Sequence, residues 1–252
     1  MSARVLVLDA HGALEQALCA CLAAAGARVL AHRREPLADE PPPGVRGVCD
    51  ADPAARLAAW DAEHGSFDTI VLGQPRDTAS GSGTGGGFDA GFALGCAAPA
   101  SDTFEAFAQR LDTRLADFLA TLQAAAVLLR RGGNAQIWAL TQEDSSGYYL
   151  DTAPGALPVD VRARHAAIRS LGKEMLRLGV KVNAAHLQPV AEAADASAWS
   201  DAREGLKAFA LRFKPNRAAA VAGALAAWIA REDLPVAGMV VPIGIGFTEN
   251  NL

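Results

Sequence analysis

Long uncharged hydrophobic runs are missing from this sequence, although 51% of its 252 residues are hydrophobic. No run reaches about 18 residues without a charge or a Gly/Pro break, as a membrane-spanning helix requires, so we expect no membrane span. An N-terminal signal-peptide pattern is missing too, because an apolar strand pattern already begins at Val5. We therefore expect a cytoplasmic protein, with enough chain for one α/β domain and a sizeable core.

Cysteine and positive charge are also scarce. The four cysteines, Cys19, Cys21, Cys49 and Cys96, form no CxxC motif and have no nearby pair of histidines. We predict that they are buried thiols rather than metal ligands or disulfide partners, and that the chain holds no metal. The net charge is −5 and the sequence has no basic stripe, which argues against nucleic acid as a partner.

The segment from Arg4 to Arg34 predicts the opening of a nucleotide-binding α/β fold. Residues 4–8 form a short apolar run, which is typical of a buried parallel strand. Residues 16–25 are rich in Ala and Leu and predict a helix, which Gly26 ends. Residues 27–31 predict the second strand.

Strand and helix patterns alternate along the rest of the chain. Further strands are predicted at 45–48, 67–72, 136–140, 180–185 and 239–243, and further helices at 53–60, 102–109, 111–130, 158–178, 204–213 and 216–231. Asp52 is the expected N-cap of the helix that begins at Pro53. The alternation predicts a Rossmann-like, doubly wound parallel sheet of the α/β class, in three layers, as a single domain over residues 1–252. A Gly-rich loop at 76–101 contains a GxGxxG spacing, but the spacing neither follows a strand directly nor opens a helix, so we interpret it as a surface loop.

The turn after the first strand lacks the glycines that a dinucleotide site needs. Such glycines let the backbone approach the pyrophosphate, which lies at the helix N-terminus. Of Asp9, Gly12, Ala13 and Glu15, which stand at this turn, only one is glycine. The two carboxylates add a repulsion of about 1–4 kcal/mol each at roughly 4–6 Å from a phosphate, for an effective dielectric constant of about 20. We predict that no cofactor binds at this turn and that the carboxylates stabilise the helix N-terminus through its dipole instead.

Several markers of the fold resemble the short-chain dehydrogenase/reductase (SDR) family over nearly the whole chain. Residues 23–29 resemble the end of that family's first helix and its second strand, and residues 67–71 resemble its fourth strand. Residues 131–133 and 179–184 are similar to the segments that lead into its fifth and sixth strands. The segment Gly238–Gly246 is similar to its closing strand and Gly-containing tail. The resemblance implies the Rossmann-like fold of that family.

The chemical markers of the family do not match. Its catalytic Asn falls on Arg114, and its catalytic Ser falls on Thr141 or Gln142. Its Tyr-x-x-x-Lys pair falls on Leu157 and Val161. That chemistry needs a phenol as general acid and base and an ammonium group that lowers the phenol pKa, and two aliphatic side chains supply neither. We therefore predict no catalytic residue of the family's kind.

The resemblance also implies an assembly. In this family the long helices after the fourth and fifth strands pair with those of another subunit, which implies the same for residues 111–130 and 158–178. We interpret the chain as a catalytically silent subunit that supports an active SDR paralogue in a hetero-oligomer, expected to be a tetramer. The paralogue would bind NAD, and the C-terminal strand and the tail at 247–252 are further expected contacts. Similar two-subunit dehydrogenases contain one silent chain, as does the enzyme acting on the hydroxyacyl-CoA of anaerobic toluene breakdown through benzylsuccinate.

The pattern of apolar residues in the first long helix permits such an assembly. Leu115, Leu122 and Leu129 share one face at helical spacing, and Phe118 and Leu119 lie beside it. A helix that is apolar over much of its surface has to be covered on two sides. We therefore expect the sheet to cover one side of residues 111–130 and another subunit to cover the other.

Two alternatives stay open at this point. The chain could be a divergent NAD(P)-dependent oxidoreductase with a non-standard site, formed by Tyr148 or Tyr149 together with Arg114 or His165. It could also be a regulatory module that senses a nucleotide without turning it over. Both alternatives predict that the chain itself binds a nucleotide, which the silent-subunit interpretation does not.

Overall fold

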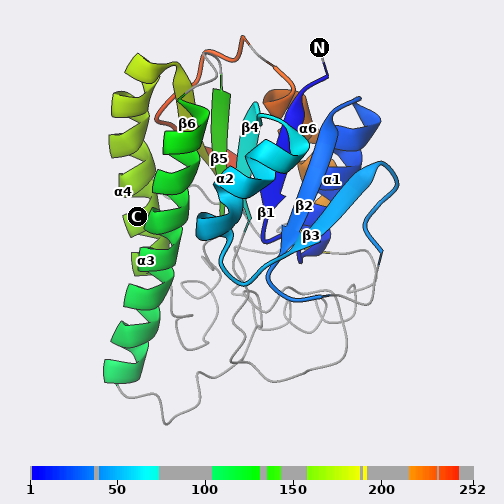
Figure 1. Ribbon diagram of the computed structural model, residues 1–252. Coiled ribbons are helices and arrows are strands. Elements are labelled where there is room, and N and C mark those ends of the chain that lie inside the picture. The colour runs from blue at the N-terminus through cyan, green and yellow to red at the C-terminus, as the bar shows by residue number, and fades with distance from the viewer. Residues whose placement is uncertain are drawn as a thin grey trace, which may run out of the picture.

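A single parallel sheet forms the centre of the molecule. The computed structural model describes residues 2–36, 40–73, 104–130, 135–142, 158–187, 190–191, 216–231 and 233–243. Seven strands lie in the order β3-β2-β1-β4-β5-β6-β9, and every neighbouring pair is parallel (Figure 1). This arrangement confirms the predicted doubly wound α/β fold.

The elements follow the predicted alternation of strand and helix. The strands of the sheet are β1 (Arg4–Leu8), β2 (Arg28–Arg33), β3 (Val45–Cys49), β4 (Thr69–Leu72), β5 (Ala135–Gln142), β6 (Val180–Leu187) and β9 (Val240–Ile243). The helices are α1 (Ala13–Ala24), α2 (Pro53–His64), α3 (Phe104–Leu129), α4 (Pro158–Met175) and α6 (Ala218–Ile229), with a 3-10 turn, η3 (Leu176–Leu178), after α4. Two short strands, β7 (Val190–Ala191) and β8 (Asn216–Arg217), pair separately.

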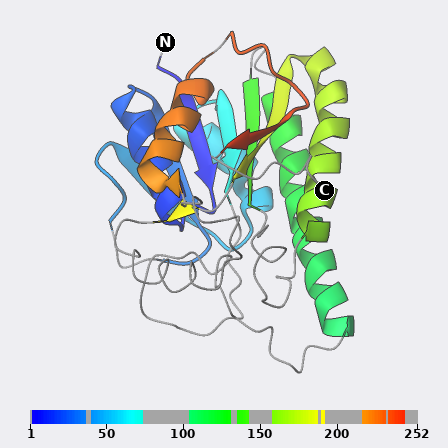
Figure 2. The same cartoon turned by 180° about the vertical axis from the view of Figure 1, so that it is seen from behind.

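The sheet lies between two layers of helices, as predicted. Along β1, Val5 and Val7 belong to the core on the side of α1 and α6, whereas Leu6 and Leu8 belong to the core under α2, α3 and α4. Figure 1 shows α2, α3 and α4 on the near face of the sheet, and Figure 2 shows α1 and α6 on the opposite face. Because both faces are covered, β1 is apolar at successive positions rather than alternating with polar residues.

Several helix boundaries differ from the sequence prediction: α2 continues to His64, α4 ends at Met175, and α6 spans Ala218–Ile229. The helices predicted at 102–109 and 111–130 form one continuous helix, α3, because Arg110 at the junction is a good helix former and no Gly or Pro interrupts it. Helix α1 begins at Ala13 rather than at residue 16, with Gly12 as its N-cap. The predicted helix at 204–213 and the Gly-rich loop at 76–101 lie outside the described residues.

Two predicted helix ends are confirmed. Asp52 caps α2, accepting a hydrogen bond from the backbone N–H of Ala55 at 3.1 Å. Gly26 follows the end of α1 with a φ of +87°, the left-handed conformation that favours glycine. Within the described ranges, no helix combines the length and the apolar character needed to cross a bilayer.

The prediction that the cysteines are buried thiols is correct for only one of the three that the structure describes. Cys19 is buried in α1, Cys21 is partly buried and Cys49 is exposed. Cys49 is exposed because it ends β3, the strand at one edge of the sheet, where fewer neighbours cover a side chain. Cys96 lies outside the described residues.

Candidate functional site

A cleft opens at the carboxyl ends of β1 and β4, where the order of the strands reverses. It is lined by both strand ends, by α3, and by single residues that follow β2 or lie on α4, and together with the open space at its mouth it measures about 400 Å³. Figure 1 shows that α3 extends past the carboxyl edge of the sheet, so its first turns lie beyond the strand ends, and residues Arg114 to Thr121 farther along the helix line the cleft. Doubly wound α/β proteins bind ligands at this position of the sheet.

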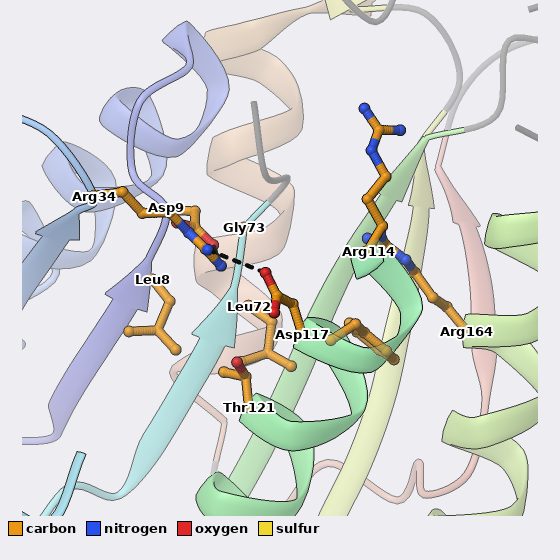
Figure 3. Close-up of a pocket in the computed structure, with 10 residues that line it drawn as sticks. Leu8, Asp9, Arg34, Leu72, Gly73, Arg114, Asp117, Thr121 and Arg164 are labelled. Atoms are coloured by element: carbon orange, nitrogen blue, oxygen red, sulfur yellow. Dashed lines mark hydrogen bonds and ion pairs between the residues drawn. The ribbon is translucent and has the colours of Figure 1, made fainter. Parts of the chain in front are cut away.

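A charged bridge crosses one side of this cleft. Arg34, just after β2, donates from Nε to Oδ1 of Asp9 at 2.8 Å and from Nη1 to Oδ2 of Asp117 at 3.3 Å. Figure 3 shows Arg34 reaching over the end of β1 toward Asp117 on α3. We call this arrangement the Arg34 bridge. Burial alone would lower the pKa of Arg34, but the hydrogen bond and charge of Asp9, together with Asp117, raise it above its ordinary value.

The Arg34 bridge gives Asp9 a different role from the one expected from the sequence. This residue was expected to stabilise the N-terminus of α1, but its carboxylate pairs with Arg34, and among the described residues no side chain caps that helix at Gly12. A full positive charge at 2.8 Å attracts a carboxylate more strongly than the partial charge of a helix end. Asp9 also adopts a φ of +52°, the only non-glycine residue described in that region.

Hydrogen bonds to His32 on β2 fix the turn at Asp9. The backbone N–H of Asp9 donates to Nδ1 of His32 at 3.3 Å, and Nε2 of His32 lies 2.8 Å from the backbone oxygen of Asp50. The N–H of Ala10 donates to the backbone oxygen of His32 at 2.8 Å. His32 is fully buried, so the turn and the two neighbouring strands form one hydrogen-bonded unit.

The end of β4 closes tightly against the same turn. A Cβ placed on Gly73 would lie 2.4 Å from the backbone oxygen of Leu8 and 3.3 Å from Cγ of Glu15. Glu15 is 3% exposed and stands in the first turn of α1, where the helix dipole favours a negative charge. The space that phosphate oxygens would need at the N-terminus of α1 is therefore next to a buried carboxylate and a close backbone contact.

These residues do not fit the pyrophosphate of a nicotinamide dinucleotide. The only glycine in the turn between β1 and α1 is Gly12, and the carboxylates of Asp9 and Glu15 are both buried there. A phosphate at this turn would compete with Asp9 for Arg34 and approach the negative charge of Glu15. The misfit follows from the charges and packing of the turn itself.

A second polar cluster lies at the carboxyl ends of β5 and β6. Oγ1 of Thr141 is 2.8 Å from Nε2 of His165 on α4 and 3.4 Å from Nδ1 of His186 on β6. The two imidazoles pack edge to face, with ring centroids 4.9 Å apart, and all three side chains are buried. In the sequence, Thr141 and His165 have no visible connection, and His186 is not predicted at all because its apolar strand context carries no signal of a site.

The other predicted positions fall into three groups. Val161 is buried on α4, and Arg114 lies half-buried on α3 at the cleft. Gln142 ends β5, but its side chain is not among those described. The remaining positions of the predicted and alternative sites, Leu157, Tyr148 and Tyr149, lie outside the described residues. In the part of the chain that the structure describes, His, Cys, Asp and Glu side chains form no group of three that could hold a metal ion.

Two arginines line the other side of the cleft. Arg164 on α4 forms two hydrogen bonds with Asp160, from Nε at 3.0 Å and from Nη2 at 2.8 Å, and its guanidinium lies 5.0 Å from the ring centre of Phe118. Burial lowers the pKa of Arg114; Asp160 raises it and the nearby charge of Arg164 lowers it further. The attraction of Arg114 to the Asp160 carboxylate therefore outweighs the repulsion by Arg164.

Comparison with known proteins gives a match in structure alone. No family model matches the sequence, and no curated protein matches it. The TT0495 protein from Thermus thermophilus superimposes with a TM-score of 0.73 at 18% identity, over 96% of this chain and 97% of that chain. A short-chain type dehydrogenase/reductase from Mycobacterium ulcerans gives a TM-score of 0.70 at 18% identity, over 96% of this chain and 90% of that chain. The chain shares the fold of these proteins.

A third structure is described as a departure from the usual chemistry of the fold. It is a short-chain oxidoreductase from Pseudomonas aeruginosa with an atypical catalytic center, and it matches with a TM-score of 0.68 at 15% identity, over 98% of this chain and 97% of that chain. At such identities the likeness establishes the SDR fold and not the chemistry. What this chain does has to be argued from its own residues.

Proposed function

We propose that this chain is a catalytically silent, SDR-like subunit that assembles with an active, NAD-dependent SDR paralogue in the cytoplasm. The Arg34 bridge carries the proposal. It joins the end of β1 to α3 across the cleft with the protein's own charges, where a cofactor would bring phosphate. Binding a dinucleotide would mean breaking the pair between Arg34 and Asp9 and leaving Asp9, 7% exposed, without its counter-ion.

The surface of α3 supports the assembly half of the proposal. Leu122 and Leu129, which share one apolar face of α3, pack into the core of the monomer, so they belong to the side that the sheet covers. Among the side chains of this helix that the structure describes, the large apolar ones left exposed are Leu119, 42% exposed, and Val127, 44% exposed. We assign the subunit contact to the side of α3 that carries these two residues, together with α4 and the C-terminal strand and tail.

The proposed partner is an SDR with an intact cofactor turn, in a hetero-oligomer that we expect to be a tetramer. A hydroxyacyl-CoA dehydrogenase of aromatic degradation is the model for such a pair, by resemblance to the two-subunit enzymes of that kind. Co-expression of this chain with an SDR paralogue encoded beside it, followed by native mass measurement, tests the assembly directly. Recovery of the two chains as separate species would contradict it.

A thermal-shift experiment tests whether the chain binds a nicotinamide cofactor. The purified chain is heated with NAD, NADH, NADP or NADPH at millimolar concentration, and we expect no change in Tm. An active SDR is measured in the same plate to establish that the assay detects cofactor binding. An increase of several degrees for this chain would contradict the proposal, because a ligand that binds the native state raises stability by mass action.

One observation favours a second candidate function, a divergent NAD(P)-dependent oxidoreductase. The hydroxyl of Thr141, which falls at the family's catalytic Ser, is 2.8 Å from Nε2 of His165, and an imidazole is a competent proton donor and acceptor. This candidate predicts a thermal shift with a nicotinamide cofactor and cofactor-dependent carbonyl reduction that is lost in His165→Gln. A shift without any turnover would instead indicate the nucleotide-sensing module.

A further inference from the structure

We propose that two copies of this chain pair through one exposed side of α3 when the paralogue is absent. The inference names a second partner for the surface that the proposed function assigns to the paralogue, and it does not depend on the chain being silent. Five exposed residues define the surface, which we call the α3 face: Asp112, Leu119, Gln123, Val127 and Arg130. Figures 1 and 2 both show α3 along one side of the molecule.

Helical spacing places the members of the α3 face on one side of the helix. Successive members are 7, 4, 4 and 3 residues apart, and each of these separations returns a side chain to the same side. Arg130 follows Leu129, the last residue of α3, but its backbone N–H still donates to the oxygen of Ala126 at 3.2 Å. It therefore continues the helical path of the face.

The α3 face carries opposite charges at its two ends. Asp112 and Arg130 are 18 residues apart, which corresponds to about 27 Å along a helix, and the exposed apolar side chains of Leu119 and Val127 lie between them. Within the described residues, no ion pair engages either Asp112 or Arg130. Both charges are therefore available to a partner, unlike that of Asp117, which belongs to the Arg34 bridge.

The charged pair and the apolar pair are centred on almost the same point of the helix. The midpoint of Asp112 and Arg130 is position 121, and that of Leu119 and Val127 is position 123, two residues or about 3 Å away. A two-fold axis at this point, perpendicular to α3, would bring Asp112 of each copy toward Arg130 of the other and would join the apolar side chains. A crossing angle of about 20° keeps the two helices close over this length. Gln123 lies beside the axis, where its amide can both donate to and accept from its own copy.

Charge complementarity favours a second copy of the chain as the occupant of this surface. A nucleic acid or an anionic membrane would be attracted by Arg130 but repelled by Asp112. A two-fold contact requires a surface that complements itself, and the α3 face has an acid, an apolar centre and a base in the order that such a contact needs. The purified chain is therefore expected to be a homodimer, from which the paralogue would displace one copy.

Sedimentation velocity on the purified full chain, without paralogue or cofactor, tests the inference. We expect a reversible dimer of twice the chain mass of 26.1 kDa. Arg28→Glu is the matched control for charge reversal, because it changes an exposed arginine at the start of β2 and should dimerise like the wild type. A wild-type chain that stays monomeric across the concentration range of the experiment would overturn the proposal.

Two charge-reversal variants locate the contact. Asp112→Arg and Arg130→Glu should each weaken the dimer about 10-fold or more, because each substitution creates two like-charge pairs in a two-fold contact. An equimolar mixture of the two variants should dimerise like the wild type, since one then presents two bases and the other two acids. Unchanged dimerisation of either variant alone, or no recovery in the mixture, would overturn the proposal. If a reversal variant does not fold, Arg130→Gln replaces it and should weaken the dimer in the same direction.

The outcome is separable from that of the proposed function. Self-association is measured on this chain alone, whereas the proposed function is tested by co-expression with the paralogue and by thermal shift with nicotinamide cofactors. A chain that is monomeric alone but assembles with the paralogue contradicts only the homodimer. A homodimer that does not assemble with the paralogue contradicts only the proposed function.

Discussion

His32 illustrates how a single residue joins the cleft to the body of the protein. Its ring is fully buried, with Nδ1 facing the N–H of Asp9 and Nε2 next to the backbone oxygen of Asp50, and the ring of Trp60 lies 5.1 Å away, centroid to centroid. Burial lowers the pKa of His32 below its ordinary value, against the opposing effects of the Asp50 hydrogen bond and the charges of Asp9 and Asp50. The neutral imidazole is therefore the form that the fold requires.

This requirement predicts a pH dependence of stability. The unfolded chain binds a proton at His32 as the pH falls below about 6.5, whereas the native chain resists it, so the free energy of unfolding falls with decreasing pH in that range. Urea unfolding at a series of pH values measures the slope. In His32→Gln the slope should be shallower below pH 6.5, because the group that resists protonation in the native chain is removed. Identical slopes in wild type and His32→Gln would contradict the prediction.

The different burial of Cys19 and Cys49 predicts that the two thiols react at different rates. Burial, followed by the charge of Glu15, raises the pKa of Cys19 to about 12, whereas Cys49 is exposed. Since the thiolate is the reactive form, iodoacetamide at pH 8 should modify Cys49 in the native protein and leave Cys19 unmodified. Peptide mass spectrometry after a timed reaction measures both sites, and the same reaction in denaturant should modify both. Equal native rates would contradict the assigned environment.

At the scale of elements, the close approach of β4 to the turn after β1 shapes the cleft. Gly73 donates its backbone N–H to the oxygen of Leu8 at 3.0 Å, extending the contact between the two strands beyond their paired residues. The contact leaves no space for a side chain at Gly73. Glycine is needed at this position for close packing, and the bulk of any other residue would push the strand end away from the turn.

The packing of Gly73 predicts how far a single added methyl group lowers the stability of the protein. Gly73→Ala should lower the free energy of unfolding by about 1–3 kcal/mol, because its Cβ would meet the oxygen of Leu8 at 2.4 Å. Gly223→Ala on α6 is the control: nothing lies within 4 Å of the added Cβ, and alanine should stabilise that helix by about 0.5–1 kcal/mol. Chemical denaturation measures both. A neutral effect at Gly73 would contradict the close contact.

Across the whole molecule, the two helix layers differ in what they offer to the proposed assembly. Helices α1 and α6 cover one face of the sheet, and α2, α3 and α4 cover the other. The exposed apolar side chains of α3 belong to the layer formed by α2, α3 and α4, so the proposed subunit contact lies on that layer. The cleft lies at the carboxyl edge of the same sheet, next to α3 and α4, so an assembly through these helices would have the cleft at its border.

The proposed contact predicts the effect of a double substitution. Leu119→Asp combined with Val127→Asp should abolish co-purification with the paralogue, because it puts two charges on the assembly surface, and should change the free energy of unfolding of the isolated chain by only about 0.5 kcal/mol per site. Ala20→Asp, at an exposed position of α1 across the sheet, should assemble normally. Pull-down with native mass measurement reads out assembly. Wild-type assembly by the double variant would place the contact elsewhere.

Local patterns in the sequence were sufficient for most of the elements. The apolar run of β1, the Asp52 cap of α2 and the Gly26 end of α1 follow from interactions within a few residues, so a single segment carries each signal. The break predicted within α3 was wrong because no residue there disfavours a helix. The loss of the glycines after β1 could also be recognised from the sequence, since the turn lies at a fixed place after the first strand.

The charges of the cleft depended on tertiary structure. Arg34 and Asp117 are 83 positions apart, and Thr141 meets His186 across 45 positions. Such contacts depend on the register of parallel strands and on where α3 lies against the sheet, neither of which a local pattern specifies. The sequence by itself determined that the turn lacks the glycines of a dinucleotide site. Only the fold decided that Asp9 pairs with Arg34 and that Arg114 and Arg164, from separate helices, line the same cleft, because both depend on long-range packing.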